Sequence, residues 1–134
     1  MDIYEGSYIC VLSGQLFLVA AICNYNWCNY FESSIIFLVY ITSIYYHKNP
    51  TCINKILDEY MARITVLVSI SSSLYYYNIF PSIFTSTMAY MYFNAPKFQL
   101  NSHISNLYHA ICVHIPCFLG LMSLYYNNKS IVKY

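Results

Sequence analysis

The sequence predicts an all-α fold: a polytopic membrane helix bundle with about five transmembrane helices. The first observation is composition, because 59% of the 134 residues are hydrophobic and only 8% are charged. A soluble domain carries roughly 25% charged residues, so this chain has too little charge to cover a water-facing surface. The second observation is that the apolar residues fall into five long runs separated by short polar connections. We therefore treat residues 1–134 as a single integral membrane domain whose surroundings are the lipid bilayer.

The first two runs are expected to cross the bilayer at about residues 8–24 and 30–46. The acidic segment Met1–Glu5 lacks the positive charge that starts a signal peptide, so we interpret the first run as a retained span. Aromatic residues around Trp27 follow it, and such residues suit a membrane interface. The second run is expected to end at His47–Asn49, because Pro50 disfavours helix at the residue before it.

The third run is expected to cross at about residues 60–77. Asp58 and Glu59 should lie in its first turn, where carboxylates complement the helix dipole. Arg63 follows about one turn later. It should either pair with Glu59 or extend its side chain to the nearby interface.

The last two spans are expected at about residues 79–93 and 106–126. The fourth run is short and rich in Ser, Thr and Met, and Pro81 near its start suits a first helical turn. The fifth run contains His109 and His114, and His103 comes just before it.

Several classes of function find no support in the sequence. The net charge is +1 with no basic block, which gives nucleic acid no electrostatic footprint. Gly-x-Ser-x-Gly, His-Glu-x-x-His and phosphate-loop motifs are absent. The six cysteines contain no C-x-x-C pair, so a structural zinc site is unsupported. We interpret Cys10, Cys23, Cys112 and Cys117, which lie in or at the ends of apolar runs, as small packing residues. A Cys23–Cys28 disulfide is the alternative if that connection faces an oxidising compartment.

The number of crossings determines which residues share a side of the membrane. With five spans, the N-terminus lies on the same side as the connections at residues 47–57 and 94–104. That side has more basic residues, so the N-terminus is expected to be cytoplasmic. Its basic residues are Lys48, Lys55, Arg63 and Lys97, against Lys129 and Lys133 on the other side.

This topology also places His47, Asp58 and His109 on one side of the membrane at similar depth. Ser43 lies one helical turn before His47 and shares its face. His114 lies about 140° around a regular helix from His109, so it is expected to point elsewhere. Polar residues in membrane segments are costly and are candidates for function.

Histidine nitrogens, a carboxylate and an open water position make up a catalytic zinc site. If the cluster is a catalytic site, we predict His47 and His109 as metal ligands and Ser43 and Asp58 as catalytic residues, with zinc as the cofactor; for a non-catalytic bundle we expect no cofactor.

The motif Ser43-x-x-x-His47, with Asp58 opening the next span and Tyr108-His109 opening a late one, resembles the CREST superfamily. This superfamily includes the alkaline ceramidases and the adiponectin-receptor and hemolysin-III proteins. The resemblance implies a membrane bundle in which three histidines bind zinc. It also implies an enzyme that hydrolyses lipid amides or esters. In that pattern the last span carries H-x-x-x-H, and here its first position is Ser105, with His103 two residues away.

Three hypotheses follow. The first is a small multi-pass membrane protein without a catalytic site, which has a structural or interaction role. The second is a zinc-dependent membrane hydrolase of the CREST type, complete or degenerate, with a lipid substrate. The third is an oligomer or channel-like subunit in which Arg63 and the histidines line a shared path.

Overall fold

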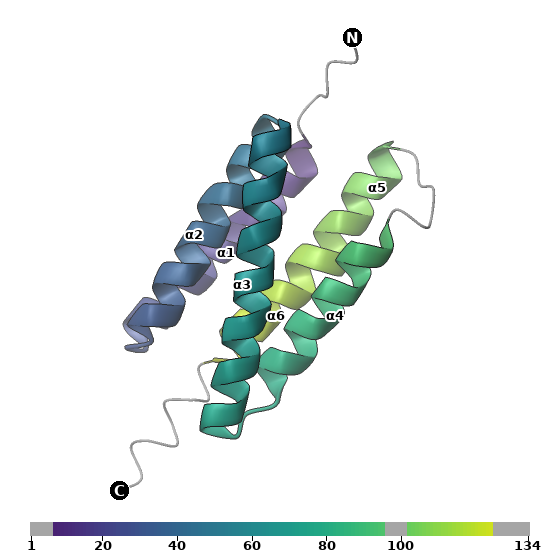
Figure 1. The fold of residues 1–134 in the computed structure, drawn as a ribbon. Coiled ribbons are helices and arrows are strands. Elements are labelled where there is room, and N and C mark those ends of the chain that lie inside the picture. The colour runs from purple at the N-terminus through teal and green to yellow at the C-terminus, as the bar shows by residue number, and fades with distance from the viewer. Residues whose placement is uncertain (1–6, 96–101, 125–134) are drawn as a thin grey trace, which may run out of the picture.

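The computed structural model describes residues 7–95 and 102–124, and this part of the chain is all-helical (Figure 1). The expected helical class is therefore confirmed. The described chain forms five helical rods, and the fifth rod consists of three consecutive segments, α5, η2 and α6, of which η2 is a π-helical turn. The elements are α1 (Tyr8–Asn26), α2 (Tyr30–Lys48), α3 (Cys52–Tyr76), α4 (Phe80–Asn94), α5 (Ser102–His109), η2 (Ala110–His114) and α6 (Ile115–Met122).

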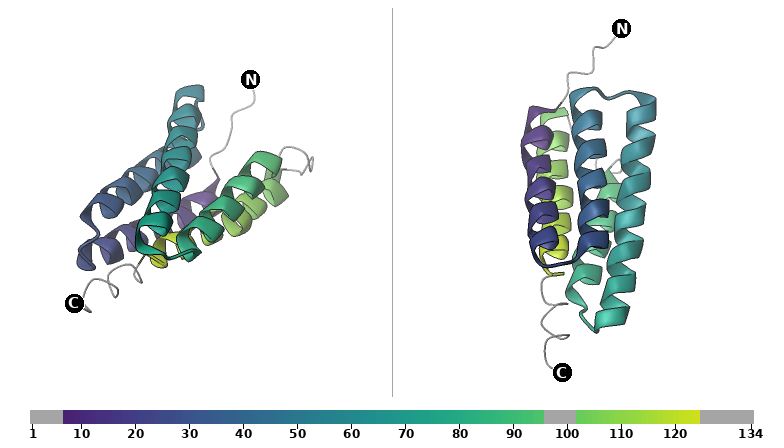
Figure 2. Two further views of the ribbon diagram at one scale, coloured as in Figure 1. Left: turned by 60° about the horizontal axis from the view of Figure 1, so that its bottom comes forward. Right: turned by 90° about the vertical axis from the view of Figure 1, so that its left-hand side faces the viewer.

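The helices form a closed ring in which successive rods are antiparallel and the last rod runs parallel to α1 (Figure 1). Each of α1 to α3 packs on the next helix, α4 packs on α6 and η2, and the last rod returns to pack on α1 (Figure 2). A ring of this kind encloses a central axis to which every rod contributes side chains. The apolar core occupies the middle of that axis. Its buried members are Phe17, Ala20, Ala21, Ile36, Val39, Met88, Val113, Cys117, Leu121 and Leu124.

Glycines allow two pairs of rods to approach closely. A Cβ atom on Gly120 would lie 3.0 Å from Cβ of Phe84, so α6 and α4 are in near-backbone contact there. A Cβ atom on Gly14 would lie 3.1 Å from the end of Ile44, where α1 meets α2. Small residues at helix interfaces permit this packing, which is characteristic of membrane bundles.

The start of α3 corrects an expectation. The helix begins at Cys52, because the Thr51 side chain caps it by accepting a hydrogen bond from the backbone N–H of Asn54 at 3.2 Å. Asp58 therefore lies in the second turn rather than the first, and its side chain is buried. The apolar pattern alone placed the start too late, since the first turn of α3 is polar and exposed.

The charged residues of α3 also differ from expectation. Glu59 pairs with Lys55, with 3.8 Å between Nζ and Oε1. No other ion pair is found among residues 7–95 and 102–124. Arg63 instead lies over aromatic rings, 6.0 Å from the centre of Tyr60 and 5.9 Å from that of Phe93. The predicted Arg63–Glu59 pair is therefore wrong.

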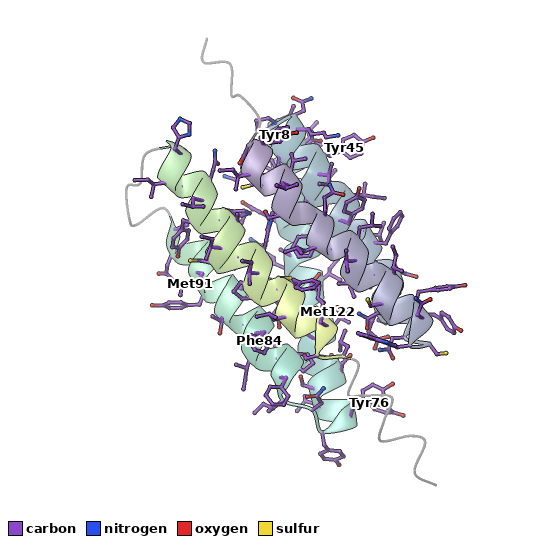
Figure 3. All side chains as sticks on the ribbon, turned by 180° about the vertical axis from the view of Figure 1, so that it is seen from behind. Tyr8, Tyr45, Tyr76, Phe84, Met91 and Met122 are labelled. Carbon is purple, nitrogen blue, oxygen red and sulfur yellow. The ribbon has the colours of Figure 1, made fainter. Side chains whose placement is uncertain are left out.

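The outer surface is apolar over much of its length. Leu12, Leu67 and Leu74 are each about two-thirds exposed or more, at 67%, 65% and 73%. By length and composition, two helical stretches of the described chain can cross a bilayer: Tyr8–Asn26 and His103–Met122. Tyrosines gather at both ends of the rods, as Tyr8 and Tyr45 at one end and Tyr76 at the other illustrate (Figure 3). The six cysteines are free thiols, Cys23 and Cys28 included.

Candidate metal centre

Three histidines from distant parts of the chain meet inside the bundle. His47 comes from the last turn of α2, His109 ends α5, and His114 ends η2. Their ligand nitrogens all lie within 4.8 Å of one another. Nitrogens that share one tetrahedral zinc are roughly 3.3–3.5 Å apart, given Zn–N bonds of about 2.0–2.1 Å. An inward shift of about 1 Å would bring the three rings onto one ion.

His114 belongs to the cluster because the last rod is not a regular α-helix. Residues 110–114 form a π turn in which the N–H of Ile115 donates to the carbonyl of Ala110, five residues earlier. A π turn takes one more residue than an α turn, so a residue five positions on returns to the same face. The expectation that His114 points away from His109 is therefore wrong, because it assumed regular α-helical rotation.

Pro116 gives a physical reason for the π turn. Proline has no N–H, and inside a helix its ring collides with the carbonyl four residues earlier, which here belongs to Cys112. Widening the preceding turn moves that carbonyl away from the proline ring. A five-residue His109–His114 spacing followed by Pro116 is thus the sequence signal that identifies the third histidine.

Ser13 on α1 fixes the orientation of His114. The Ser13 hydroxyl lies 2.7 Å from Nδ1 of His114 and also donates to the carbonyl of Cys10 at 3.2 Å. Because a hydroxyl has one proton, we infer that Nδ1–H of His114 donates to Ser13. This tautomer leaves Nε2 as the nitrogen that can bind a metal, an arrangement typical of zinc-binding histidines.

Two polar atoms of α2 are buried without a hydrogen-bond partner among the described residues: Ser43 Oγ and His47 Nε2. Buried polar atoms almost always have a partner, and leaving one unsatisfied costs about 1–3 kcal/mol. These two atoms lie one helical turn apart on the face that His109 and His114 approach. Their position fits a polar ligand or metal at this point.

A small inner cavity of about 30 Å³ lies beside the histidines. Ser43, Asp58, His109 and His114 are among the residues that line it. A cavity of this size holds about one water molecule. The structure thus brings together all four site residues that the sequence singled out, since His47 contacts the ring of His109 at 5.0 Å between centres. Their chemical roles remain predictions.

His47 and Asp58 lie just outside the expected spans, and burial changes the pKa of both. Burial, with His109 alongside, lowers the pKa of His47 to about 3. The imidazole is therefore neutral at physiological pH, which is the form that binds zinc. Burial, with Glu59 alongside, raises the pKa of Asp58 to about 7. A carboxyl group with such a pKa can both accept and release a proton near neutral pH.

Neither residue considered as a third ligand in the last span takes that place. Ser105 and His103 are both exposed, and His103 is not part of the histidine cluster. Tyr92 of α4, by contrast, lines the inner cavity and packs against His109 with 5.6 Å between ring centres. Its hydroxyl donates to Oε1 of Glu59 at 3.4 Å. No sequence signal points to this role, because Tyr92 is one of many tyrosines near a span end.

Comparison with family models, curated proteins and solved structures yields no match to this chain. The functional argument therefore depends on the geometry of the site.

Proposed function

We propose that this protein is a membrane-embedded, zinc-dependent hydrolase of lipid amides or esters. The observation that carries the proposal is the convergence of three histidine nitrogens within 4.8 Å. Three protein ligands plus one open position is the composition of a catalytic zinc site, whereas structural sites use four. His47, His109 and His114 would be the ligands. When bound there, zinc supplies Lewis acidity and lowers the pKa of a coordinated water molecule.

Asp58 and Ser43 have distinct roles in this proposal. Asp58 accepts a proton from the water whose oxygen bonds to the substrate carbonyl carbon. It then gives that proton to the leaving nitrogen or oxygen as the C–N or C–O bond breaks. The Ser43 hydroxyl, which has no partner among the described residues, donates a hydrogen bond to the carbonyl oxygen. The buried position of both groups limits access of bulk water to the reacting atoms.

Measuring zinc per chain tests the proposal. We expect about one zinc per wild-type chain purified in detergent, and loss of zinc from His47→Ala, His109→Ala and His114→Ala. His103→Ala is the matched control, because His103 is an exposed histidine of the same rod. Circular dichroism and gel filtration establish that each variant is folded. Zinc content that is unchanged in the three cluster variants would reject the metal site and favour a structural or interaction role.

The membrane topology is a separate proposal. The two apolar stretches Tyr8–Asn26 and His103–Met122, the exposed leucines and the tyrosines at both ends support a bundle that crosses the bilayer five times. The N-terminus then lies on the cytoplasmic side with the site. The third hypothesis, a channel path shared by Arg63 and the histidines, is less favoured, because Arg63 is exposed on the outer face of α3.

Two natural cysteines allow the topology to be tested. Cys28 and Cys52 are exposed and flank opposite ends of α2, a helix of 19 residues that spans about 28 Å. In single-cysteine variants, a membrane-impermeant maleimide should label Cys28 in intact cells and Cys52 only after permeabilisation. Labelling of both residues from the same side would contradict a spanning α2.

A further inference from the structure

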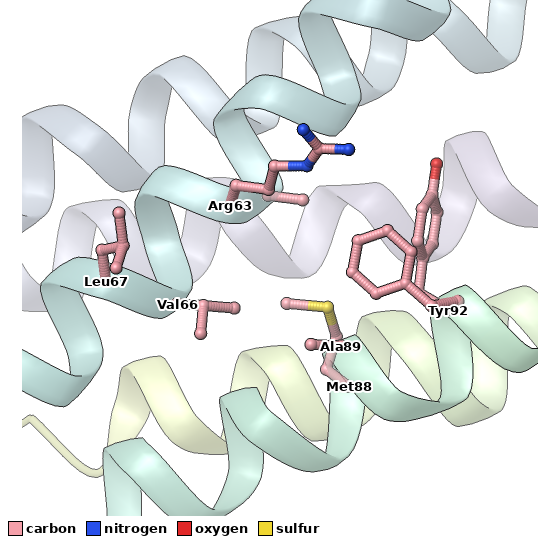
Figure 4. Close-up of a pocket in the computed structure, with 8 residues that line it drawn as sticks. Arg63, Val66, Leu67, Met88, Ala89 and Tyr92 are labelled. Atoms are coloured by element: carbon pink, nitrogen blue, oxygen red, sulfur yellow. The ribbon is translucent and has the colours of Figure 1, made fainter.

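An apolar groove runs along the outside of the bundle between α3 and α4. It has a volume of about 270 Å³ and is lined by side chains that include Val66 and Leu67 from α3 and Ala89 and Phe93 from α4 (Figure 4). Its size is at the lower end of small-molecule sites, which are about 300–1,000 Å³. Leu67 and Phe93 are more than half exposed, so the groove opens sideways, toward lipid in a membrane bundle.

The groove leads to the candidate metal centre. Ala62, Met88 and Tyr92 line both the groove and the inner cavity. Tyr92 also packs on His109. These three residues are therefore the boundary between the outer groove and the histidines. A chain that lies in the groove would reach the inner cavity at this point.

The positively charged side chain of Arg63 lies at the end of the groove nearest Tyr92. Arg63 lines it and extends from α3 toward the side where Tyr92 lies (Figure 4). Its guanidinium group forms no ion pair with any described carboxylate and contacts the faces of Tyr60 and Phe93 instead. A guanidinium group presents a planar set of donors that matches a carboxylate or phosphate. An apolar groove with such a group at one end is complementary to an acyl chain that carries an oxyanion.

We propose that the α3–α4 groove binds the acyl chain of an anionic lipid and that Arg63 binds its carboxylate or phosphate group. Combined with the proposed function, on which this step rests, the substrate class is an acyl amide or ester whose leaving portion is anionic. The acyl carbonyl enters past Ala62 and Tyr92 toward the histidines. The anionic portion stays outside on Arg63.

Photo-crosslinking tests the groove without any need for catalysis. The probes are a diazirine-bearing long-chain fatty acid, the matching alkyl phosphate, and the neutral methyl ester of the fatty acid, each used on the full chain in detergent. We expect both anionic probes to label peptides of α3 and α4. Arg63→Gln should reduce this labelling about tenfold, as loss of a charged hydrogen bond implies. Labelling by the methyl ester should not change.

Matched variants complete the experiment. Lys48→Gln removes an exposed cation away from the groove and should have no effect. Ala89→Trp fills the groove and should abolish labelling, whereas Thr87→Trp, on the opposite face of α4, should not. The α1–α2 groove of about 330 Å³, whose lining residues are uncharged, serves as an internal reference. If it is labelled as strongly as α3–α4, or if Arg63→Gln binds the anionic probes like wild type, the proposal is wrong.

The two proposals can fail separately. His109→Ala should lose zinc yet keep full labelling of the groove, because no histidine lines the groove. Labelling of one anionic probe but not the other identifies whether the natural head group is a carboxylate or a phosphate.

Discussion

Both ends of the bundle bury polar side chains. Those at the α1–α2 connection are hydrogen-bonded, whereas two at the other end are not, and Ser69 Oγ on α3 also lacks a partner among the described residues. At the α1–α2 connection, the amide of Asn24 donates to the carbonyls of Ala20 and Leu121 at 2.9 and 3.1 Å. The amide of Asn29 donates to Asn24 and to the carbonyl of Leu124 at 3.1 and 3.4 Å. At the other end, Ser43 Oγ and His47 Nε2 are equally buried and lack a partner among the described residues.

We infer from this difference that the asparagines have a structural role and that the histidine end is the candidate for ligand binding. The asparagines connect the α1–α2 turn to the end of α6, and each of their bonds replaces one to water, which makes the network stabilising. The histidine end carries unsatisfied polar atoms that cost stability in the absence of a ligand. We interpret Ser43 and His47 as groups that bind a ligand, because buried polar atoms almost always have a partner. Substitutions of the asparagines should therefore lower the free energy of unfolding, whereas substitutions at the histidine end should lower zinc affinity.

The largest effect on stability is expected from Asn24→Ala. It removes two donated hydrogen bonds and the acceptor of Asn29, and it should cost about 2–3 kcal/mol in the free energy of unfolding. Zinc per chain should not change in protein that remains folded. Unfolding in detergent and metal analysis measure the two quantities. Asn54→Ala, which removes an exposed side-chain bond to the carbonyl of Asn49, is the control and should cost much less. Loss of zinc in folded Asn24→Ala would remove the distinction between the ends.

Ser13→Ala is expected to lower zinc affinity and to leave the free energy of unfolding almost unchanged, the opposite of Asn24→Ala. Without the hydroxyl, Nδ1 of His114 loses the partner that selects its tautomer, so zinc affinity should fall about tenfold to a hundredfold. Stability of the metal-free protein should change little, because one partly buried hydrogen bond is lost. Competition with a zinc-binding dye measures the affinity. Ser13→Thr, which keeps the hydroxyl, should restore most of it. If Ser13→Ala binds zinc like wild type, Ser13 does not orient a metal ligand.

The sequence predicts the fold better than the complete site, and the reason is local. Apolar runs identify the rods because polar connections interrupt the apolar pattern where the helices end. The number of expected spans was enough to predict that His47, Asp58 and His109 lie at one end of the bundle. The start of α3 was misplaced because it depends on a single hydrogen bond to Thr51. His114 was missed because side-chain direction was derived from ideal helical rotation, which the turn before Pro116 does not follow.

The smallest predicted effect concerns that turn. Pro116→Ala restores a backbone N–H that can bond to the carbonyl of Cys112, so the metal-free rod should relax toward a regular α-helix and become more stable. Relaxation turns His114 away from His109. Binding zinc then requires the π turn to form again. The free energy of zinc binding should therefore become less favourable by the amount that relaxation stabilised the metal-free protein. A gain of about 1 kcal/mol implies a loss of roughly fivefold in zinc affinity.

Two measurements together identify this coupling. The metal-free Pro116→Ala protein should be more stable than metal-free wild type, and the advantage should disappear when both are saturated with zinc, because bound zinc holds the same turn in each. Pro81→Ala is a suitable control, since Pro81 lies in the first turn of α4, where proline leaves no bond unmade. If Pro116→Ala lowers stability in both states, the proline supports the rod by packing. In that case the π turn has another cause, and the placement of His114 does not depend on Pro116.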